Sequence, residues 1–300
     1  MVHRCRFDEK YGLPVEAREA YARDGVVVLE DFVPAAHCDA LRARALELVA
    51  RFAPAASRTV FSTRDNRHAR DKYFEESANG IGVFFEEGAL DVQGRLLVPL
   101  NKAVNKIGHA MHDLDPVFDA FSRGPRLQAI ADGIGLGAPR LVQSMYIFKQ
   151  PGIGGEVLCH QDSTFLYTEP QSVVGFWFAI EDAHQGNGCL GGLPGEHRKG
   201  LREIYRKHAD GQLKMEVIQP ALAWDMSRLE WLEVGKGALI VFNGEFPHLS
   251  LPNRSAQSRH AYTLHAVSGL AHYPAGNWIQ RWSPTDVPFS GFVGPAVGRH

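Results

Sequence analysis

The sequence predicts a mainly β fold with flanking α-helices: a double-stranded β-helix (a cupin-like jelly roll) with an N-terminal helical layer. Before residue 140 the apolar residues recur at helical spacing. Beyond it, short segments rich in Val, Ile, Phe, Tyr and Trp are separated by Gly, Pro, Asn and Asp. Short strands divided by turns are typical of a sandwich or barrel, because a parallel sheet needs helices between its strands. We therefore expect a single domain over 1–300, in which 1–140 is mostly helical support and 141–300 forms an eight-stranded jelly-roll core.

The N-terminal part begins with one expected strand and continues with expected helices. Residues 25–30 are short, apolar and β-branched, which favours a strand. Pro34 opens a run over 35–52 whose apolar residues return at helical spacing. Two further helices are expected at 101–113 and 115–134.

The C-terminal part provides the expected strands of the jelly roll. They are rich in β-branched and aromatic residues and are bounded by turn-forming residues. They cover 141–149, 173–180, 238–242 and 259–267.

The composition is that of an ordinary globular protein. Hydrophobic residues make up 45% and the formal net charge is -2, so no positive field attracts nucleic acid or an anionic membrane. No apolar run approaches the roughly 20 residues that span a bilayer, and the N-terminus lacks the apolar core of a signal peptide. The 4 cysteines are scattered without a CxxC pair, which favours free thiols and a cytoplasmic location.

A His-x-Asp pattern, which can provide two metal ligands, occurs at 37–39, 160–162 and 208–210. The first lies near the start of an expected helix, where positions i and i+2 point about 200° apart. The third lies in a polar stretch that favours a solvated turn. The second follows an expected strand, where positions i and i+2 share a face, so His160 and Asp162 can converge on one ion.

His248 is the candidate third ligand, because it follows the expected strand 238–242 and a turn at Asn243 and Gly244. Two imidazoles and one carboxylate hold Fe(II) on one face and leave three coordination positions open. With 14 histidines in the chain, such a match is common by itself.

Arg259 is a candidate for binding an anion at those open positions. It begins an expected strand in which Ala261, Thr263 and His265 share its face. An arginine directed into an apolar barrel is costly without an anionic partner, and its guanidinium matches a carboxylate bidentately. The alternative is an arginine on an edge strand that faces solvent.

Two other patterns have simpler interpretations. Gly133, Gly135 and Ala138 have the spacing of a dinucleotide-binding fingerprint, but they follow an expected helix instead of a strand. The basic stretch 197–208 has the charge to bind a phosphorylated substrate, although a solvated helix face explains it more simply.

The chain resembles the phytanoyl-CoA dioxygenase family over nearly its whole length. The resemblance rests first on the long run from the strand 141–149 to just past the second His-x-Asp pattern, residues 143–151, 154–156, 160–162 and 165–170. Shorter matching motifs lie at 24–30, 105–110, 181–182, 187–190, 194–197, 259–263 and 277–278.

The resemblance implies a double-stranded β-helix enzyme that uses Fe(II), 2-oxoglutarate and O2. Such an enzyme converts 2-oxoglutarate to succinate while hydroxylating a small-molecule substrate. The resemblance gives His160, Asp162 and His248 as the catalytic iron ligands, and Arg259 as the partner of the C5 carboxylate of 2-oxoglutarate. It places further co-substrate contacts at Lys106, Met145, Gln161, Trp177 and Ser250.

One departure from the family pattern bears on the substrate. Gly191 and Gly192 stand where relatives have bulky residues, so we expect a wider pocket or a loosened strand. The substrate therefore stays open, including whether it is a CoA thioester. Asp162 favours oxygenation, because halogenating relatives replace this carboxylate with a small residue.

Two other classes of protein fit the same residues. One is a non-catalytic jelly-roll protein that binds a metal or a small acid. The other is a zinc hydrolase with the same ligands, which would give Arg259 no role. The sequence does not predict an oligomeric state.

Overall fold

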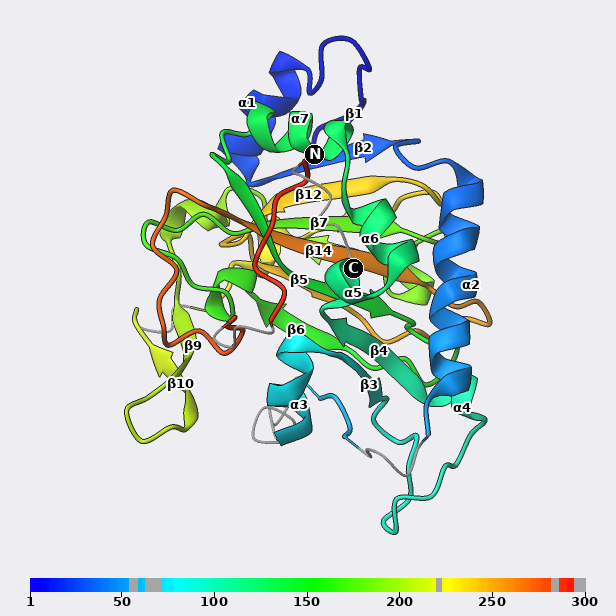
Figure 1. The fold of residues 1–300 in the computed structure, drawn as a ribbon. Coiled ribbons are helices and arrows are strands. Elements are labelled where there is room, and N and C mark those ends of the chain that lie inside the picture. The colour runs from blue at the N-terminus through cyan, green and yellow to red at the C-terminus, as the bar shows by residue number, and fades with distance from the viewer. Residues whose placement is uncertain (54–58, 63–71, 220–222, 282–285, 294–300) are drawn as a thin grey trace.

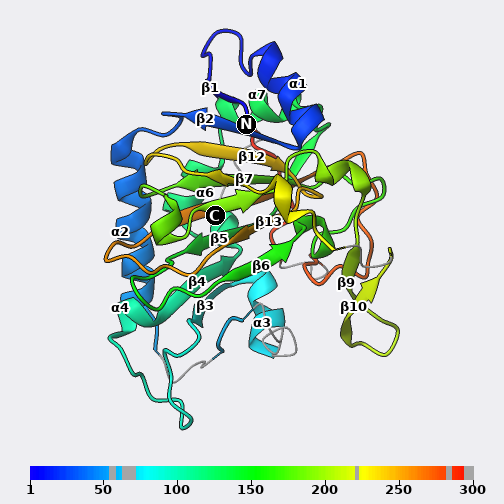
Figure 2. The same cartoon turned by 180° about the vertical axis from the view of Figure 1, so that it is seen from behind.

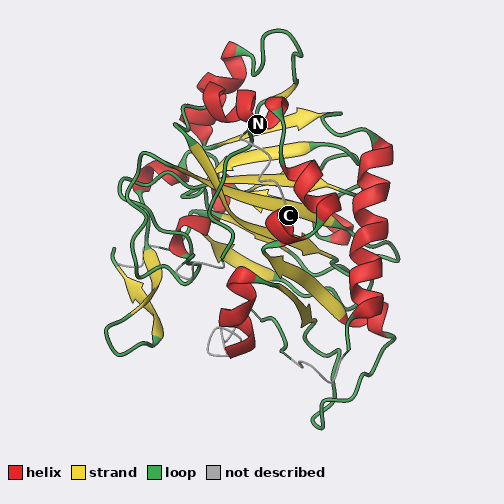
Figure 3. Cartoon of the chain, viewed as in Figure 1, coloured by secondary structure: helices red, strands yellow, loops and turns green. Residues whose placement is uncertain are grey.

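The computed structural model describes residues 1–53, 59–62, 72–219, 223–281 and 286–293. Its strands form a large sheet, a smaller sheet and a hairpin, with helices around the large sheet (Figures 1 and 3). The helices are α1 Val15–Asp24, α2 Ala35–Arg51, α3 Lys72–Glu76, α4 Leu100–Ala103, α5 Met111–Leu114, α6 Pro116–Ser122 and α7 Pro125–Gly133. None of the described helices is long and apolar enough to cross a membrane.

The large sheet has 8 strands in the order β1-β2-β12-β7-β14-β5-β4-β3. All its neighbouring strands are antiparallel except the parallel pair β1 and β2. Its strands are β1 Arg4–Arg6, β2 Val26–Glu30, β3 Ile81–Phe85, β4 Val104–His109, β5 Pro139–Ile147, β7 Val174–Ala179, β12 Leu239–Asn243 and β14 Ala261–Ser268.

The smaller sheet has 4 strands in the order β11-β8-β13-β6 and lies over the face of the large sheet that is seen from behind (Figure 2). Its strands are β6 Val157–His160, β8 Leu190–Gly192, β11 Glu230–Leu232 and β13 His248–Ser250. A separate hairpin is formed by β9 Glu203–Lys207 and β10 Leu213–Val217.

Both faces of the central strands β2, β12 and β7 are buried, which explains why these strands are almost entirely apolar. In β2, Val27 and Leu29 pack in the core beneath the helices, while Val26 and Val28 pack against the smaller sheet. Two opposed sheets with helices on the outer face make a jelly roll with an N-terminal helical layer, so the predicted fold class is confirmed. The segment 1–140 also provides β1 to β4, half of the large sheet.

One expected helix, 101–113, is wrong. The structure has α4, then strand β4, then the short α5. Residues of β4 pair with β3 on one side and with β5 on the other, so tertiary hydrogen bonding overrides a local sequence that is compatible with a helix. This strand directs Lys106 into the space between the sheets and Ile107 into the helix-covered core.

Smaller differences concern boundaries. The expected helix 115–134 is two helices, because Pro125 begins α7 after a break at Gly124, whose φ is 144°. The basic stretch 197–208 is not a helix face: a short 3-10 turn, Glu196–Lys199, precedes strand β9. The strands expected at 25–30, 141–149, 173–180, 238–242 and 259–267 are present as β2, β5, β7, β12 and β14.

Candidate metal centre and its pocket

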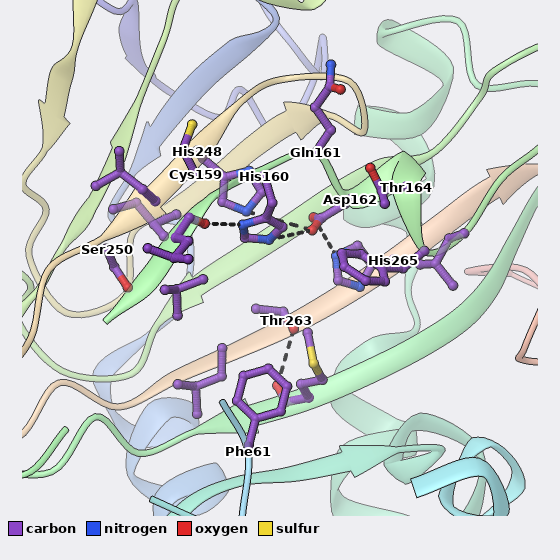
Figure 4. Close-up of a pocket in the computed structure, with 18 of the residues that line it drawn as sticks. Phe61, Cys159, His160, Gln161, Asp162, Thr164, His248, Ser250, Thr263 and His265 are labelled. Atoms are coloured by element: carbon purple, nitrogen blue, oxygen red, sulfur yellow. Dashed lines mark hydrogen bonds and ion pairs between the residues drawn. The ribbon is translucent and has the colours of Figure 1, made fainter. Parts of the chain in front are cut away.

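Three candidate ligands converge between the two sheets. His160 ends β6 and His248 begins β13, and the two are paired in register, so their side chains share a face. Asp162 begins the 3-10 turn after β6. Its Oδ1 lies 3.4 Å from Nε2 of His160 and 3.7 Å from Nε2 of His248 (Figure 4). The three ligand atoms lie within 4.8 Å of one another, and no other described trio of His, Cys, Asp or Glu does so.

The backbone fixes both imidazoles in the form that binds a metal. Nδ1 of His160 lies 2.8 Å from the carbonyl oxygen of Leu158, and Nδ1 of His248 lies 3.0 Å from that of Phe246. A ring nitrogen beside a carbonyl donates a hydrogen bond, so Nδ1 carries the proton and Nε2 can present its lone pair toward Asp162. Such a convergence of lone pairs and a carboxylate suits a cation.

The charges of His248 and Asp162 agree with a metal site. Burial lowers the pKa of His248 to about 4, so its ring is neutral near pH 7, as metal binding requires. Burial alone would raise the pKa of Asp162, but His265 and His248 hold it well below its usual range. Burial likewise opposes the charged form of His160, yet its hydrogen bond with Asp162 raises its pKa.

His265 is a residue whose role the sequence does not reveal. It belongs to β14, is buried, and its Nε2 lies 2.8 Å from Oδ2 of Asp162. This contact holds one carboxylate oxygen and leaves Oδ1 facing the two histidines, as outer-sphere partners of metal ligands do. In the sequence, the one indication that His265 belongs to the site is that it shares a face of the expected strand with Arg259.

Arg259 lies just before β14 and is only 2% exposed, so the alternative of an edge arginine facing solvent is wrong. Its Nε donates to the carbonyl oxygen of Gly188 at 3.0 Å, while Nη1 is buried without a described hydrogen-bond partner. Burial lowers its pKa to about 10, so it is still charged near pH 7. A buried guanidinium with unmet donors suits an anionic ligand.

The remaining expected co-substrate residues all line the same cavity. Nζ of Lys106 lies 3.4 Å from the ring centre of Phe61 and 3.8 Å from Sδ of Met145, and burial lowers its pKa to about 7. Nε1 of Trp177 is buried without a described hydrogen-bond partner. Ser250 follows His248 by two residues on β13 and faces the same space.

Gln161 has a different arrangement from the others. Its Nε2 donates to the carbonyl oxygens of Gly200 and Glu245, and its Oε1 accepts from the backbone N–H of Arg202. The side chain extends away from the three ligands (Figure 4). Its amide therefore fixes the segment before β9, and only part of the residue borders the cavity.

The cavity has a volume of about 620 Å³ and continues from the three ligands into an apolar chamber. Aromatic and aliphatic side chains dominate its wall, and the β9–β10 hairpin provides one side. They include Phe61, Phe165, Leu166, Met215, Trp224 and Trp278. A space of this size holds a small molecule beside a co-substrate.

The expected effect of Gly191 and Gly192 on the cavity is wrong. A Cβ at Gly192 would lie 2.2 Å from the ring of Phe246, and one at Gly191 would lie 2.8 Å from the ring of Trp231. Aromatic rings therefore fill the space that larger residues would occupy. Neither glycine lines the cavity, and β8 stays paired with both β11 and β13.

Comparison with known proteins agrees with this geometry. The family model described as phytanoyl-CoA dioxygenase (PhyH) matches residues 21–261. The chain is 42% identical to phytanoyl-CoA dioxygenase of Arabidopsis thaliana, over 86% of this chain and 90% of that protein. It is also 42% identical to phytanoyl-CoA dioxygenase domain-containing protein 1 of Rattus norvegicus, over 90% and 94% respectively, which confirms the resemblance.

A solved structure shares the fold at low identity. It is the epimerase SnoN in complex with Fe3+, alpha ketoglutarate and nogalamycin RO, with a TM-score of 0.61 and 13% identity over 93% of this chain and 95% of that one.

Proposed function

The chain belongs to the phytanoyl-CoA dioxygenase family, and we propose that it is an Fe(II)- and 2-oxoglutarate-dependent dioxygenase. It couples the conversion of 2-oxoglutarate to succinate to the hydroxylation of a small-molecule substrate. The observation that supports this proposal is the joint presence, in one cavity, of the His160, Asp162 and His248 cluster and of the buried Arg259. A protein of the same fold that was solved with Fe3+ and alpha ketoglutarate supports the choice of cofactors.

In this proposal His160, Asp162 and His248 bind the iron and leave one face open. Iron bound there supplies the activation of O2 that drives oxidative decarboxylation and C–H hydroxylation. The chain itself keeps both histidines in the required tautomer through Leu158 and Phe246.

The co-substrate lies between the iron ligands and Arg259. Arg259 binds the C5 carboxylate, because its unmet donors are buried at the cavity wall. Ser250, Lys106, Met145 and Trp177 border the same space. Holding the far carboxylate fixes the orientation in which the keto acid end meets the metal.

The apolar chamber receives the primary substrate. Its aromatic and aliphatic wall excludes water and binds an apolar portion of the substrate beside the open face of the metal site.

The test measures succinate. The purified protein with Fe(II) and 2-oxoglutarate is supplied with a small-molecule extract as a source of substrates, in air and without oxygen. We expect succinate only in air, and none above background from His160→Ala or Asp162→Ala, since each removes one of the three metal ligands. Wild-type amounts from Asp162→Ala would refute the proposal. Conversion of a compound in the extract without oxygen and without succinate formation would favour the zinc hydrolase. Binding of 2-oxoglutarate without any succinate formation would favour the binding protein.

A further inference from the structure

Lys149 is a buried cation at the Arg259 end of the cavity. It follows β5, is only 2% exposed, and lines the same cavity as the metal ligands. Its backbone carbonyl accepts from the backbone N–H of Arg259 at 3.3 Å and from the side chain of Asn253 at 2.8 Å. The backbones of these two buried residues are therefore held next to each other.

Gly188 brings these two side chains together. Its carbonyl oxygen accepts from Nε of Arg259, and a Cβ on it would lie 2.7 Å from Cε of Lys149. The glycine has a φ of 80°, which other residues rarely adopt. The backbone at this point thus approaches both cations closely.

The hydrogen bonds of Lys149 determine where the hydroxyl of Ser250 can point. Nζ donates to the carbonyl oxygen of Gly155 at 2.6 Å and to Oγ of Ser250 at 2.8 Å. Because Oγ accepts from Lys149, the single hydrogen of Ser250 is left for another acceptor. No described residue accepts it, and Ser250 borders the cavity.

The acidic groups near Lys149 differ in burial and charge. Glu86, Glu156, Cys189 and Arg259 act on it electrostatically. Glu86 is buried and accepts from the backbone N–H of Gly155, while burial raises the pKa of the Cys189 thiol to about 12 and so keeps it neutral. Glu156 and Glu181, which act on Lys149 and Arg259 respectively, are partly exposed, so Glu86 is the buried carboxylate that the two cations share. An anionic ligand stabilises this arrangement.

We propose that Lys149 is a positioning residue for the co-substrate. Its ammonium turns the hydroxyl hydrogen of Ser250 toward the carboxylate that Arg259 binds, and it adds a second positive charge beside that carboxylate. This inference rests on the proposed function, since the far carboxylate belongs to 2-oxoglutarate. A purely structural role would instead limit Lys149 to holding Gly155 ahead of β6.

The principal test is the variant Lys149→Met. The backbone at this position is left-handed, with a φ of 39°, and the side chain of methionine is unbranched like that of lysine, so the substitution adds no strain there. Thermal unfolding is measured on Mn(II)-loaded protein with 2-oxoglutarate or with oxalate, which lacks a distant carboxylate. We expect most of the stabilisation by 2-oxoglutarate to be lost and that by oxalate to be kept. The ligand-free variant should unfold no lower than wild type, because it loses a cation whose pKa burial lowers to about 7. Lys102→Met, on an exposed lysine of α4, is the matched control.

Kinetics provide the second readout. With Lys149→Met the KM for 2-oxoglutarate should rise at least about tenfold, the loss expected for one hydrogen bond to a charged group, while kcat at saturation stays within about twofold of wild type. Ser250→Ala should raise the same KM, and the double variant should raise it by less than the product of the two single effects, because Lys149 acts in part through Ser250.

Each contrary outcome has a separate meaning. Full stabilisation of Lys149→Met by 2-oxoglutarate, or multiplicative KM effects in the double variant, would overturn the positioning role. Equal losses with oxalate and 2-oxoglutarate, with a lower unfolding temperature of the ligand-free variant, would establish the structural role in its place. If wild type itself gains no stability from 2-oxoglutarate, the proposed function fails instead.

Discussion

At the residue scale, Asp162 contacts side chains from both sheets. Its Oδ1 faces His160 and His248 of the smaller sheet, and its Oδ2 contacts His265 of the large sheet. One carboxylate therefore depends on side chains from three strands for its orientation. This arrangement makes His265 the residue through which the large sheet affects the metal site.

Replacing His265 tests that dependence. His265→Phe keeps a ring in β14 but removes the contact with Asp162, so the iron concentration needed for half-maximal succinate formation should rise about 10- to 100-fold. Activity at saturating iron should largely return. His272→Phe, at an exposed histidine, serves as the control. An unchanged iron requirement would show that Asp162 needs no support from β14.

Lys106 leads to a prediction about pH. Burial lowers its pKa from 10.5 to about 7, so between those values the unfolded chain binds more protons than the folded protein. Stability contributed by this group therefore rises as pH rises from 7 toward 10.5, by up to about 1.4 kcal/mol per pH unit, and is flat below 7. Lys106→Met should raise the free energy of unfolding near pH 7.

Urea unfolding of the ligand-free protein at pH 6, 7, 8 and 9 checks this prediction. The difference in stability between Lys106→Met and wild type should be greatest at pH 6 and 7 and should shrink by pH 9. A difference that does not vary with pH would mean that Lys106 keeps an ordinary pKa in the folded protein.

At the element scale, β8 shows how a short strand depends on its neighbours. A residue larger than glycine does not fit at position 192, because the ring of Phe246, which lies before β13, occupies the space that its side chain would need. Gly192→Val should destabilise the protein by about 1–3 kcal/mol through overpacking, and Phe246→Ala by about 3–5 kcal/mol through a cavity.

The double variant distinguishes this packing from an effect of the strand alone. With both substitutions, valine fills part of the space left by the ring, so the loss should be smaller than the sum by about 0.5–3 kcal/mol. Chemical denaturation of the four proteins measures the difference. Strict additivity would show that the two side chains do not compete for one space.

The elements also show what the sequence could reveal. β2, β7 and β12 are predictable because both of their faces are buried and nearly all of their residues are apolar. β4 is not, because its strand conformation comes from pairing with β3 and β5, far away in the sequence. The 3-residue strand β13 is too short for any periodicity.

The candidate site was only partly predictable for related reasons. Strand context selected His160 and Asp162 and made His248 and Arg259 candidates, and a family resemblance added their roles. The role of Lys149 was not predictable because a lysine at a strand end usually faces solvent, and for His265 the strand face that it shares with Arg259 did not indicate a contact with Asp162. Only the packing of two sheets reveals their burial and contacts.

At the scale of the whole molecule, the cavity lies between the two sheets and takes residues from both. The candidate metal ligands come from β6, the turn after it and β13, while Lys106, Met145, Trp177 and Arg259 come from the large sheet or its margin. A co-substrate that spans from the metal to Arg259 therefore contacts both sheets. Its binding energy should depend on the metal and on Arg259 together.

The most direct measurement is an anaerobic calorimetric titration of 2-oxoglutarate into the Fe(II)-loaded protein. We expect one molecule to bind per chain, with binding weakened at least about tenfold when iron is omitted or when Arg259 is replaced by alanine. Equal affinity with and without iron, or in wild type and Arg259→Ala, would contradict the assignment of this cavity to iron and 2-oxoglutarate.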